Sequence, residues 1–264
     1  MFADDVKIVS TLEDDNFLQT DLRLIQEWSL TWDLPRNNHK CTILPNSEID
    51  RYQLQLNNEA VPYVDEIKDL RVRMHASFKP SAQCVVAANK ARRALFVQQK
   101  AIASTNADVW IPLYKAYARP HLEYCVKAWS PYLNKDMAIL EHIQRMATRW
   151  VTGLKGFPYF KRLKRLDLFG LERRRLRGDL IEVYKEVNHS STGRLELRNN
   201  RPLRGHNLEL KKKHCRLDVP KGFFTHRVVN PWNVLLQDVV KAPTLESFKY
   251  RLESCWLSYF PDII

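Results

Sequence analysis

The chain has 264 residues, a net charge of +12 and 45% hydrophobic residues, which allows one large domain or two modest domains with hydrophobic cores. Only 7 residues are glycine, which argues against a many-stranded sandwich or barrel and favours a mostly helical fold. The longest apolar runs are far shorter than the roughly 18 residues of a membrane helix, so we expect no membrane-spanning segment and no membrane partner.

The first 76 residues predict short strands around one helix. Residues 6–9 predict a strand after a turn, and apolar residues recur at helical spacing from about Glu13 to Asp33. Residues 41–44 predict a further strand, and the Asn57-Asn58 pair predicts the turn of a hairpin. We therefore expect a mixed region of strands and helix over residues 1–76.

From about Pro80 onward the spacing of apolar residues becomes helical. Further helices are expected at roughly 107–118, 121–129, 135–152, 158–167, 171–188 and 244–259. Low apolar density between residues 189 and 220 predicts an exposed, partly flexible connector. The expected fold class is α+β, predominantly α.

Terminal, cysteine, histidine and tryptophan patterns give further expectations. The amino terminus lacks the basic start and apolar core of a secretory signal, so an intracellular location is expected, with nucleus and cytoplasm both open.

Five cysteines without a CxxC pair predict buried thiols. The spacing of four histidines fits no common metal site, so we expect them to be surface or core residues and not metal ligands (His121, His142, His206, His214). Tryptophans near apolar stripes predict core packing (Trp28, Trp32, Trp150, Trp232, Trp256).

Several motifs, in order along the chain, resemble a known family of enzymes. Phe2-Ala3-Asp4-Asp5 resembles the catalytic turn of reverse transcriptases. The stretch from Trp28 to Cys41, which contains Asn37 and Lys40, is similar to the next palm element of LINE-type enzymes. Lys68-Asp69-Leu70-Arg71-Val72 resembles the element on their primer-gripping hairpin.

The most specific resemblance lies further downstream. It consists of the motifs Leu113-Tyr114-Lys115, Arg119-Pro120-His121-Leu122-Glu123-Tyr124-Cys125, Ala128-Trp129-Ser130-Pro131 and Gln144-Arg145. These motifs look very like the segment that follows the polymerase core in jockey-like non-LTR retrotransposons. Trp232-Asn233 and Phe248-Lys249 extend the resemblance over practically the whole chain.

The resemblance implies a domain organisation and a function. It implies the end of a reverse transcriptase palm over residues 1–76, a thumb-like helical region over 77–130 and a basic helical region over 131–264. The implied function is RNA-directed DNA synthesis by the full-length parent. The implied partners are nucleic acid and the upstream polymerase and endonuclease portions of the parent element.

The resemblance also implies catalytic residues. Asp4 and Asp5 match the carboxylates that hold magnesium, and Lys40 matches a lysine that donates a proton to the leaving pyrophosphate. The family needs a further aspartate upstream, and only three residues precede Asp4, so we expect the chain alone to lack polymerase activity. Arg71 stands where the family usually has glycine, which is unfavourable if that turn uses positive φ.

The positive charge is concentrated late in the chain. Residues 155–227 hold 20 Lys and Arg against 8 Asp and Glu, which predicts a polyanionic partner, nucleic acid before anionic membrane. Three basic runs are expected to bind RNA or DNA backbones without sequence preference: Lys161, Arg162, Lys164 and Arg165; Arg173, Arg174 and Arg177; and Lys211, Lys212 and Lys213. Each run also fits a merely solvated surface, and the alternative function is a non-catalytic nucleic-acid-binding protein.

Overall fold

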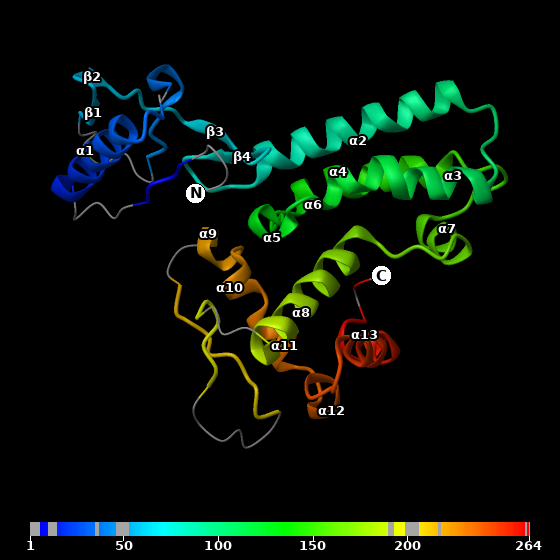
Figure 1. Cartoon of the computed structure of the whole chain (residues 1–264). Coiled ribbons are helices and arrows are strands. Elements are labelled where there is room, and N and C mark those ends of the chain that lie inside the picture. The colour runs from blue at the N-terminus through cyan, green and yellow to red at the C-terminus, as the bar shows by residue number, and fades with distance from the viewer. Residues whose placement is uncertain are drawn as a thin grey trace. The chain divides into compact units, whose positions relative to one another are not determined.

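The computed structural model describes residues 6–9, 15–34, 37–45, 53–189, 193–198, 206–215, 218–261 and 263. The chain divides into two compact units, Met1–Phe78 and Lys79–Ile264. Figure 1 shows that helices dominate the second unit, and the strands named in the described residues lie in the first. The predicted α+β, predominantly helical class is therefore confirmed.

The first unit combines one helix with two short hairpins. Its elements are α1 (Asp15–Thr31), the 3-10 helix η1 (Asn38–Lys40), β1 (Gln55–Leu56), β2 (Glu59–Ala60), β3 (Glu66–Asp69) and β4 (Val72–His75). The Gln19 side chain on α1 makes two hydrogen bonds of 2.9 Å with the backbone of Gln55. These bonds attach α1, which the sequence predicted, to the first hairpin.

Both hairpins turn through two residues with positive φ. Asn57 and Asn58 have φ values of 52° and 62°, a conformation that asparagine tolerates better than most residues. This confirms the predicted hairpin. The second turn places Leu70 and Arg71 at φ values of 44° and 70°, so the position where the resembled family has glycine does adopt left-handed backbone.

Replacing Arg71 by glycine is expected to raise the free energy of unfolding of the first unit by about 0.5–1 kcal/mol. The left-handed conformation costs a residue with a Cβ roughly 1–2 kcal/mol, and glycine avoids this cost. Glycine also has greater conformational entropy in the unfolded chain, which offsets part of the stabilisation. Urea unfolding of the full chain measures the change. The matched control is Lys68→Gly, at an exposed position in the middle of β3, which should lower the free energy of unfolding. If both variants change the free energy of unfolding in the same direction, the left-handed backbone at Arg71 is not a source of strain.

The apolar residues of α1 are only partly covered. Leu22 and Ile25 are half-buried, whereas Trp28 and Trp32 are 45% and 66% exposed. The predicted core packing of these two tryptophans is therefore wrong. The reason is geometric: α1 packs against β1, a strand of two residues that covers less surface than the helix presents.

Two predicted strands do not form among the described residues. Residues 6–9 have no strand pairing, and Val9 is 86% exposed. Residues 41–44 contribute only a single bridge, between Ile43 and Tyr63. A strand requires a neighbouring strand for its backbone hydrogen bonds, and sequence periodicity does not supply that partner.

The second unit begins with helices that pack around α2. These are α2 (Ser81–Ala101), α3 (Ala107–Leu113), the π-helix η2 (Tyr114–Ala118), α4 (Arg119–Glu123), α5 (Val126–Trp129) and α6 (Asn134–Arg149). The buried face of α2 carries small side chains, including Cys84, Ala87 and Ala91, which allow α6 and α4 to pack closely against it. The helix expected to end near residue 118 instead continues to Glu123, and the break comes at Cys125, which has a φ of 54°.

A buried polar network joins α6 to the next helices, α7 (Tyr159–Arg165) and α8 (Leu171–His189). Tyr114 Oη donates to Gln144 Oε1 at 2.8 Å. Gln144 Nε2 donates to Tyr159 Oη and to the Phe169 carbonyl, both at 2.9 Å. Because Gln144 is fully buried, this network fixes the positions of α7 and the start of α8 against α6.

A separate core forms around the second half of α8. After the short helix α9 (Asp218–Lys221), this core involves α10 (Phe224–Arg227), α11 (Val229–Asn233), α12 (Gln237–Val240), α13 (Leu245–Ser254) and α14 (Trp256–Tyr259). Tyr184 stacks on Phe248 with ring centroids 4.4 Å apart, and its hydroxyl donates to the Ala242 carbonyl at 2.6 Å. The helices predicted at 171–188 and 244–259 are thus confirmed, with a break near Cys255.

Part of the predicted connector is buried. His206 is 0% and Leu210 is 1% exposed. Trp232 Nε1 donates to the Leu208 carbonyl at 2.8 Å, and the Asn233 amide bonds both backbone groups of Leu210, at 2.8 and 2.9 Å. The prediction of an exposed connector is therefore wrong for His206, Glu209 and Leu210, because Trp232 and Asn233, distant in sequence, hydrogen-bond this segment.

The remaining composition-based expectations have mixed outcomes. Of the five free cysteines only Cys84 is buried, and Cys125 is exposed, so the prediction of buried thiols holds for Cys84 alone. Burial, with the nearby charge of Asp136, raises the pKa of Cys84 to about 12. Of the histidines that the sequence singled out, His206 is buried and the other three are exposed (His121, His142, His214).

The other three tryptophans do pack. Trp232 and Trp256 are fully buried, and Trp150 contacts the rings of Phe96 and Trp110, with centroids 5.4 and 5.8 Å away. Core packing is confirmed for these residues. Among the described residues, no helix has the length and apolar character required to cross a bilayer.

Candidate nucleic-acid interface

The residues that the resemblance marks as catalytic belong to the first unit. Asp4 and Asp5 lie outside the described residues. Lys40 ends η1, is exposed, and makes no ion pair with a described carboxylate. The described part of the chain has no group of three or more His, Cys, Asp and Glu side chains that could hold a metal ion, so it does not define a magnesium site.

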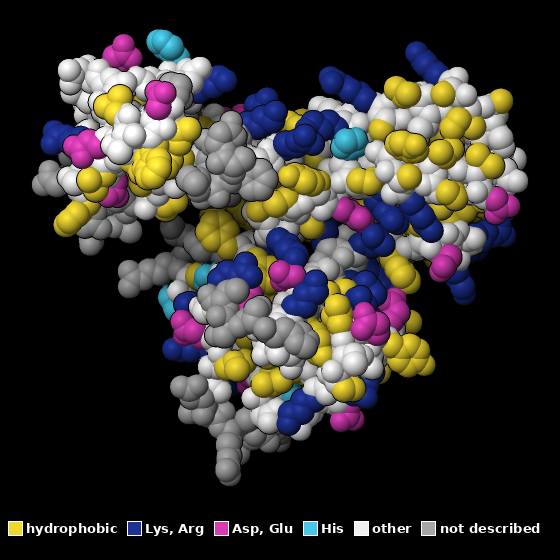
Figure 2. Space-filling view, in the orientation of Figure 1, with side chains coloured by type: hydrophobic (Ala, Val, Ile, Leu, Met, Phe, Trp, Pro, Cys, Tyr) yellow, Lys and Arg dark blue, Asp and Glu magenta, His cyan; other side chains and the backbone are white. Residues whose placement is uncertain are grey.

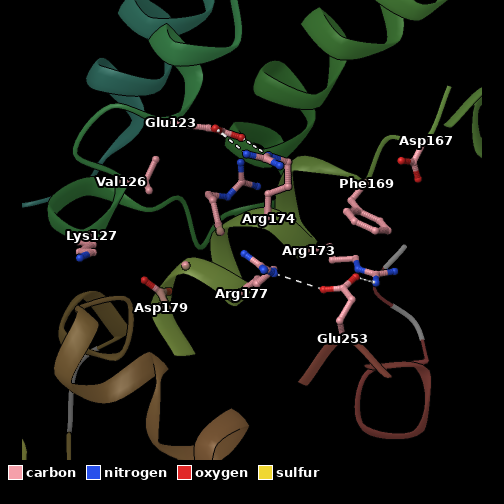
Figure 3. A pocket seen from close by; sticks show the side chains of 12 residues that line it. Glu123, Val126, Lys127, Asp167, Phe169, Arg173, Arg174, Arg177, Asp179 and Glu253 are labelled. Atoms are coloured by element: carbon pink, nitrogen blue, oxygen red, sulfur yellow. Dashed lines mark hydrogen bonds and ion pairs between the residues drawn. The ribbon is translucent and has the colours of Figure 1, made fainter. Parts of the chain in front are cut away.

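The arginine run on α8 is engaged with neighbouring helices. Figure 3 shows Arg173 and Arg177 directed toward Glu253 on α13, and Arg174 directed toward Glu123 at the end of α4. Arg177 Nε lies 3.2 Å from Glu253 Oε2, and Arg174 Nη2 donates to Glu123 Oε2 at 3.1 Å. These arginines therefore join α8 to α4 and α13.

A cavity of about 620 Å³ lies beside these ion pairs, lined by residues of α8, α13 and the segment around α5. Arg175 lines it and is only 6% exposed. Burial lowers the pKa of Arg175, whereas the charges of Glu141 and Glu172 act in the opposite direction. The positive charge around this cavity is thus largely offset by carboxylates of the chain itself.

The lysine run near residue 212 is also partly neutralised. Lys211 Nζ and Lys213 Nζ lie 3.5 and 2.7 Å from the carboxylate of Glu196. The hydrogen bond from Lys213, with the charges of both lysines, lowers the pKa of Glu196. Lys212 is exposed and has no ion pair among the described residues.

The run on α7 has a different environment. Lys161, Lys164 and Arg165 are exposed, and none forms an ion pair with a described carboxylate. Arg162 is only 7% exposed; its Nη1 donates to the Arg145 carbonyl at 3.1 Å, and its buried Nε has no hydrogen-bond partner in the described residues. This run presents three cations to solvent above a fourth that is buried.

The structure adds three cations that the sequence reasoning missed. Arg145 and Arg149 on α6 and Lys155 in the following turn are exposed, and they precede α7 directly. Residues 142–166 contain seven Lys and Arg and no Asp or Glu. We call residues 142–166 the cationic segment; the absence of acidic residues over this stretch is a signal that the sequence already contained. Figure 2 shows Lys and Arg side chains gathered around the position of α7.

The guanidinium groups of the cationic segment influence one another. Burial lowers the pKa of Arg162, and the charges of Arg149 and Arg145 lower it further. Arg145 and Arg162 both lie over the ring of Tyr159, at 5.0 and 5.5 Å from its centroid. Mutual repulsion between cations favours an external anion at this place.

The carboxylate that directly precedes the cationic segment, Glu141, already has partners. Glu141 accepts hydrogen bonds from Tyr159 Oη and, at 3.0 Å, from the backbone N–H of Leu171. Its charge is therefore directed toward the start of α8. A phosphate group, with oxygens that accept paired donors from arginine, suits the cations that remain.

Comparisons of the chain with protein-family models, curated proteins and solved structures found no match.

Proposed function

We propose that the chain is the carboxyl-terminal part of an RNA-directed DNA polymerase from a LINE-type retrotransposon, and that its second unit binds nucleic acid. The observation that carries the binding proposal is the cationic segment, with seven Lys and Arg and no Asp or Glu over residues 142–166. A nucleic acid backbone offers regularly spaced negative charges that would offset these cations and release counterions.

The contrast with the other basic runs supports this assignment. Glu253, Glu123 and Glu196 neutralise cations on α8 and near residue 212, whereas the exposed cations of the cationic segment have no described carboxylate partner. An external phosphate would take the place of that carboxylate. Contacts from Lys and Arg to phosphate carry no base information, so the binding should tolerate any sequence.

The polymerase part of the proposal rests on the motif resemblance. In that assignment Asp4 and Asp5 would hold magnesium, which activates the primer hydroxyl and stabilises charge on the leaving pyrophosphate. Lys40 would donate a proton to that pyrophosphate. Its exposure on η1 leaves the ammonium group accessible to a nucleotide.

The salt dependence of binding tests the proposal. If between four and six of the exposed cations contact phosphates, log Kd against log salt should have a slope of about 3–4 on a single strand. Between about 50 and 200 mM salt, the affinity should then fall by about 60-fold to 300-fold. Fluorescence anisotropy with the full chain and a labelled oligonucleotide measures both quantities.

An oligonucleotide of the same base sequence with an uncharged methylphosphonate backbone is the matched control. It should bind far more weakly, because it offers no charge to the cationic segment. Equal affinity for the two backbones, or an affinity that stays flat across the salt range, would contradict the proposed function.

A further inference from the structure

The exposed face of α7 combines an aromatic ring with cations. Phe160 is 53% exposed. Lys164 follows it by four positions and Lys161 precedes Lys164 by three, so the three side chains share one helix face. The opposite face buries Arg162 and Leu163. A large exposed apolar ring therefore lies beside two ammonium groups that have no described ion-pair partner.

A second planar group lies at the end of the same helix. The Arg165 guanidinium lies over the ring of Phe157, with Cζ 3.9 Å from the ring centroid. Arg165 is itself exposed, so the stacked ring holds the guanidinium plane in place without burying it. Guanidinium planes and aromatic rings are the two side-chain surfaces on which unpaired bases stack.

We propose that α7 binds single-stranded nucleic acid, with unpaired bases stacked on Phe160 and on the Arg165 guanidinium, and phosphates held by Lys161 and Lys164. This inference rests on the proposed function and specifies its ligand. In a duplex the faces of the bases are covered by their neighbours in the stack, so a side-chain ring reaches them only at an end. In a single strand each base offers a free face, whatever its identity.

Charge favours this ligand over other anionic surfaces. The cations recur along the whole cationic segment, at Arg145, Arg149, Lys155, Lys161 and Lys164, and a phosphodiester strand carries charge at every nucleotide. A helix that binds an anionic membrane inserts a broad apolar face into the membrane–water interface. The helix α7 has only 7 residues and presents one large exposed apolar side chain, Phe160, on its outer face.

Replacing Phe160 by leucine tests the inference, because leucine keeps apolar volume but has no aromatic face. We expect the full-length variant to bind a single strand about fivefold or more weakly, with the same loss on RNA and DNA strands. Affinity for a long blunt-ended duplex, which has no unpaired bases, should change by less than about twofold. Phe160→Trp should restore the wild-type affinity, since tryptophan supplies a larger ring.

The matched control is Tyr250→Leu on α13, where the tyrosine is 75% exposed. This variant should bind the single strand with the affinity of the wild type. If Phe160→Leu leaves single-strand binding unchanged, or weakens duplex binding equally, the inference is overturned while the proposed function stands. If the wild-type chain binds neither nucleic acid in low salt, the proposed function itself fails. Phe160-dependent binding to vesicles containing phosphatidylserine, without strand binding, would overturn both.

Discussion

Replacing Asp179 by alanine is expected to lower the free energy of unfolding of the second unit by about 3–5 kcal/mol. Asp179 is 5% exposed and accepts two hydrogen bonds from Arg227, one from Nε at 2.8 Å and one from Nη2 at 2.9 Å. Without the carboxylate, a guanidinium group that is largely buried loses its counter-charge. Urea unfolding of the full chain, followed by circular dichroism, measures the loss.

A double-mutant cycle separates the pair from the packing around it. Arg227 also donates to the carbonyls of Lys127 and Gly222, so Arg227→Met removes more than the ion pair. The double variant Asp179→Ala, Arg227→Met should nevertheless be more stable than the sum of the two single changes predicts, because no unpaired charge remains. Glu246→Ala is the control: its side chain is 80% exposed and pairs with Lys249 at 3.8 Å, so the cost should stay below about 0.5 kcal/mol. An Asp179→Ala cost no larger than this control would refute the prediction.

Replacing four cations of the cationic segment by glutamine, at Arg145, Arg149, Lys161 and Lys164, is expected to weaken nucleic-acid binding by about 100-fold to 1000-fold in low salt. Each lost phosphate contact also removes its share of counterion release. The slope of log Kd against log salt should therefore become shallower by about 3 on a single strand. The same anisotropy titration, repeated with the variant at several salt concentrations, yields both values.

The control must remove the same charge from elsewhere in the second unit. Lys90, Arg93, Lys100 and Lys241 are exposed, and replacing these four by glutamine gives the same net charge as the test variant. This control should lose less than about tenfold in affinity, since only general attraction is reduced. Equal losses in the two variants would mean that net charge alone, and not the cationic segment, attracts the ligand.

The sequence predicted the long helices of the second unit, because each repeats its apolar positions over several turns. The helices α6 and α8 agree with the predicted ranges within a few residues, and α2 begins at Ser81, next to the point where the helical spacing was expected to start. The sequence could not predict what covers a helix face. Trp28 and Trp32 follow the same spacing as buried residues, yet they are exposed because α1 packs against a strand of only two residues.

The basic runs illustrate the same limit for the candidate site. In the sequence, the runs on α7 and α8 are both clusters of four cations within five residues. Their difference arises from carboxylates that are distant along the chain: Glu123 is 51 residues from Arg174, and Glu253 is 76 residues from Arg177. Only folding shows which cations are already neutralised. The acid-free stretch of residues 142–166 needed no structure, because counting both signs of charge over a window of that length identifies it.

The buried amide of Gln144 has a consequence for how a ligand is received. It bonds Tyr114, Tyr159 and the Phe169 carbonyl at once, so the helix that carries Phe160 is anchored before any ligand arrives. A rigid binding surface loses little conformational entropy on association, so the ligand must adapt its shape to the protein. A flexible polymer can do this by rotating about its own backbone bonds.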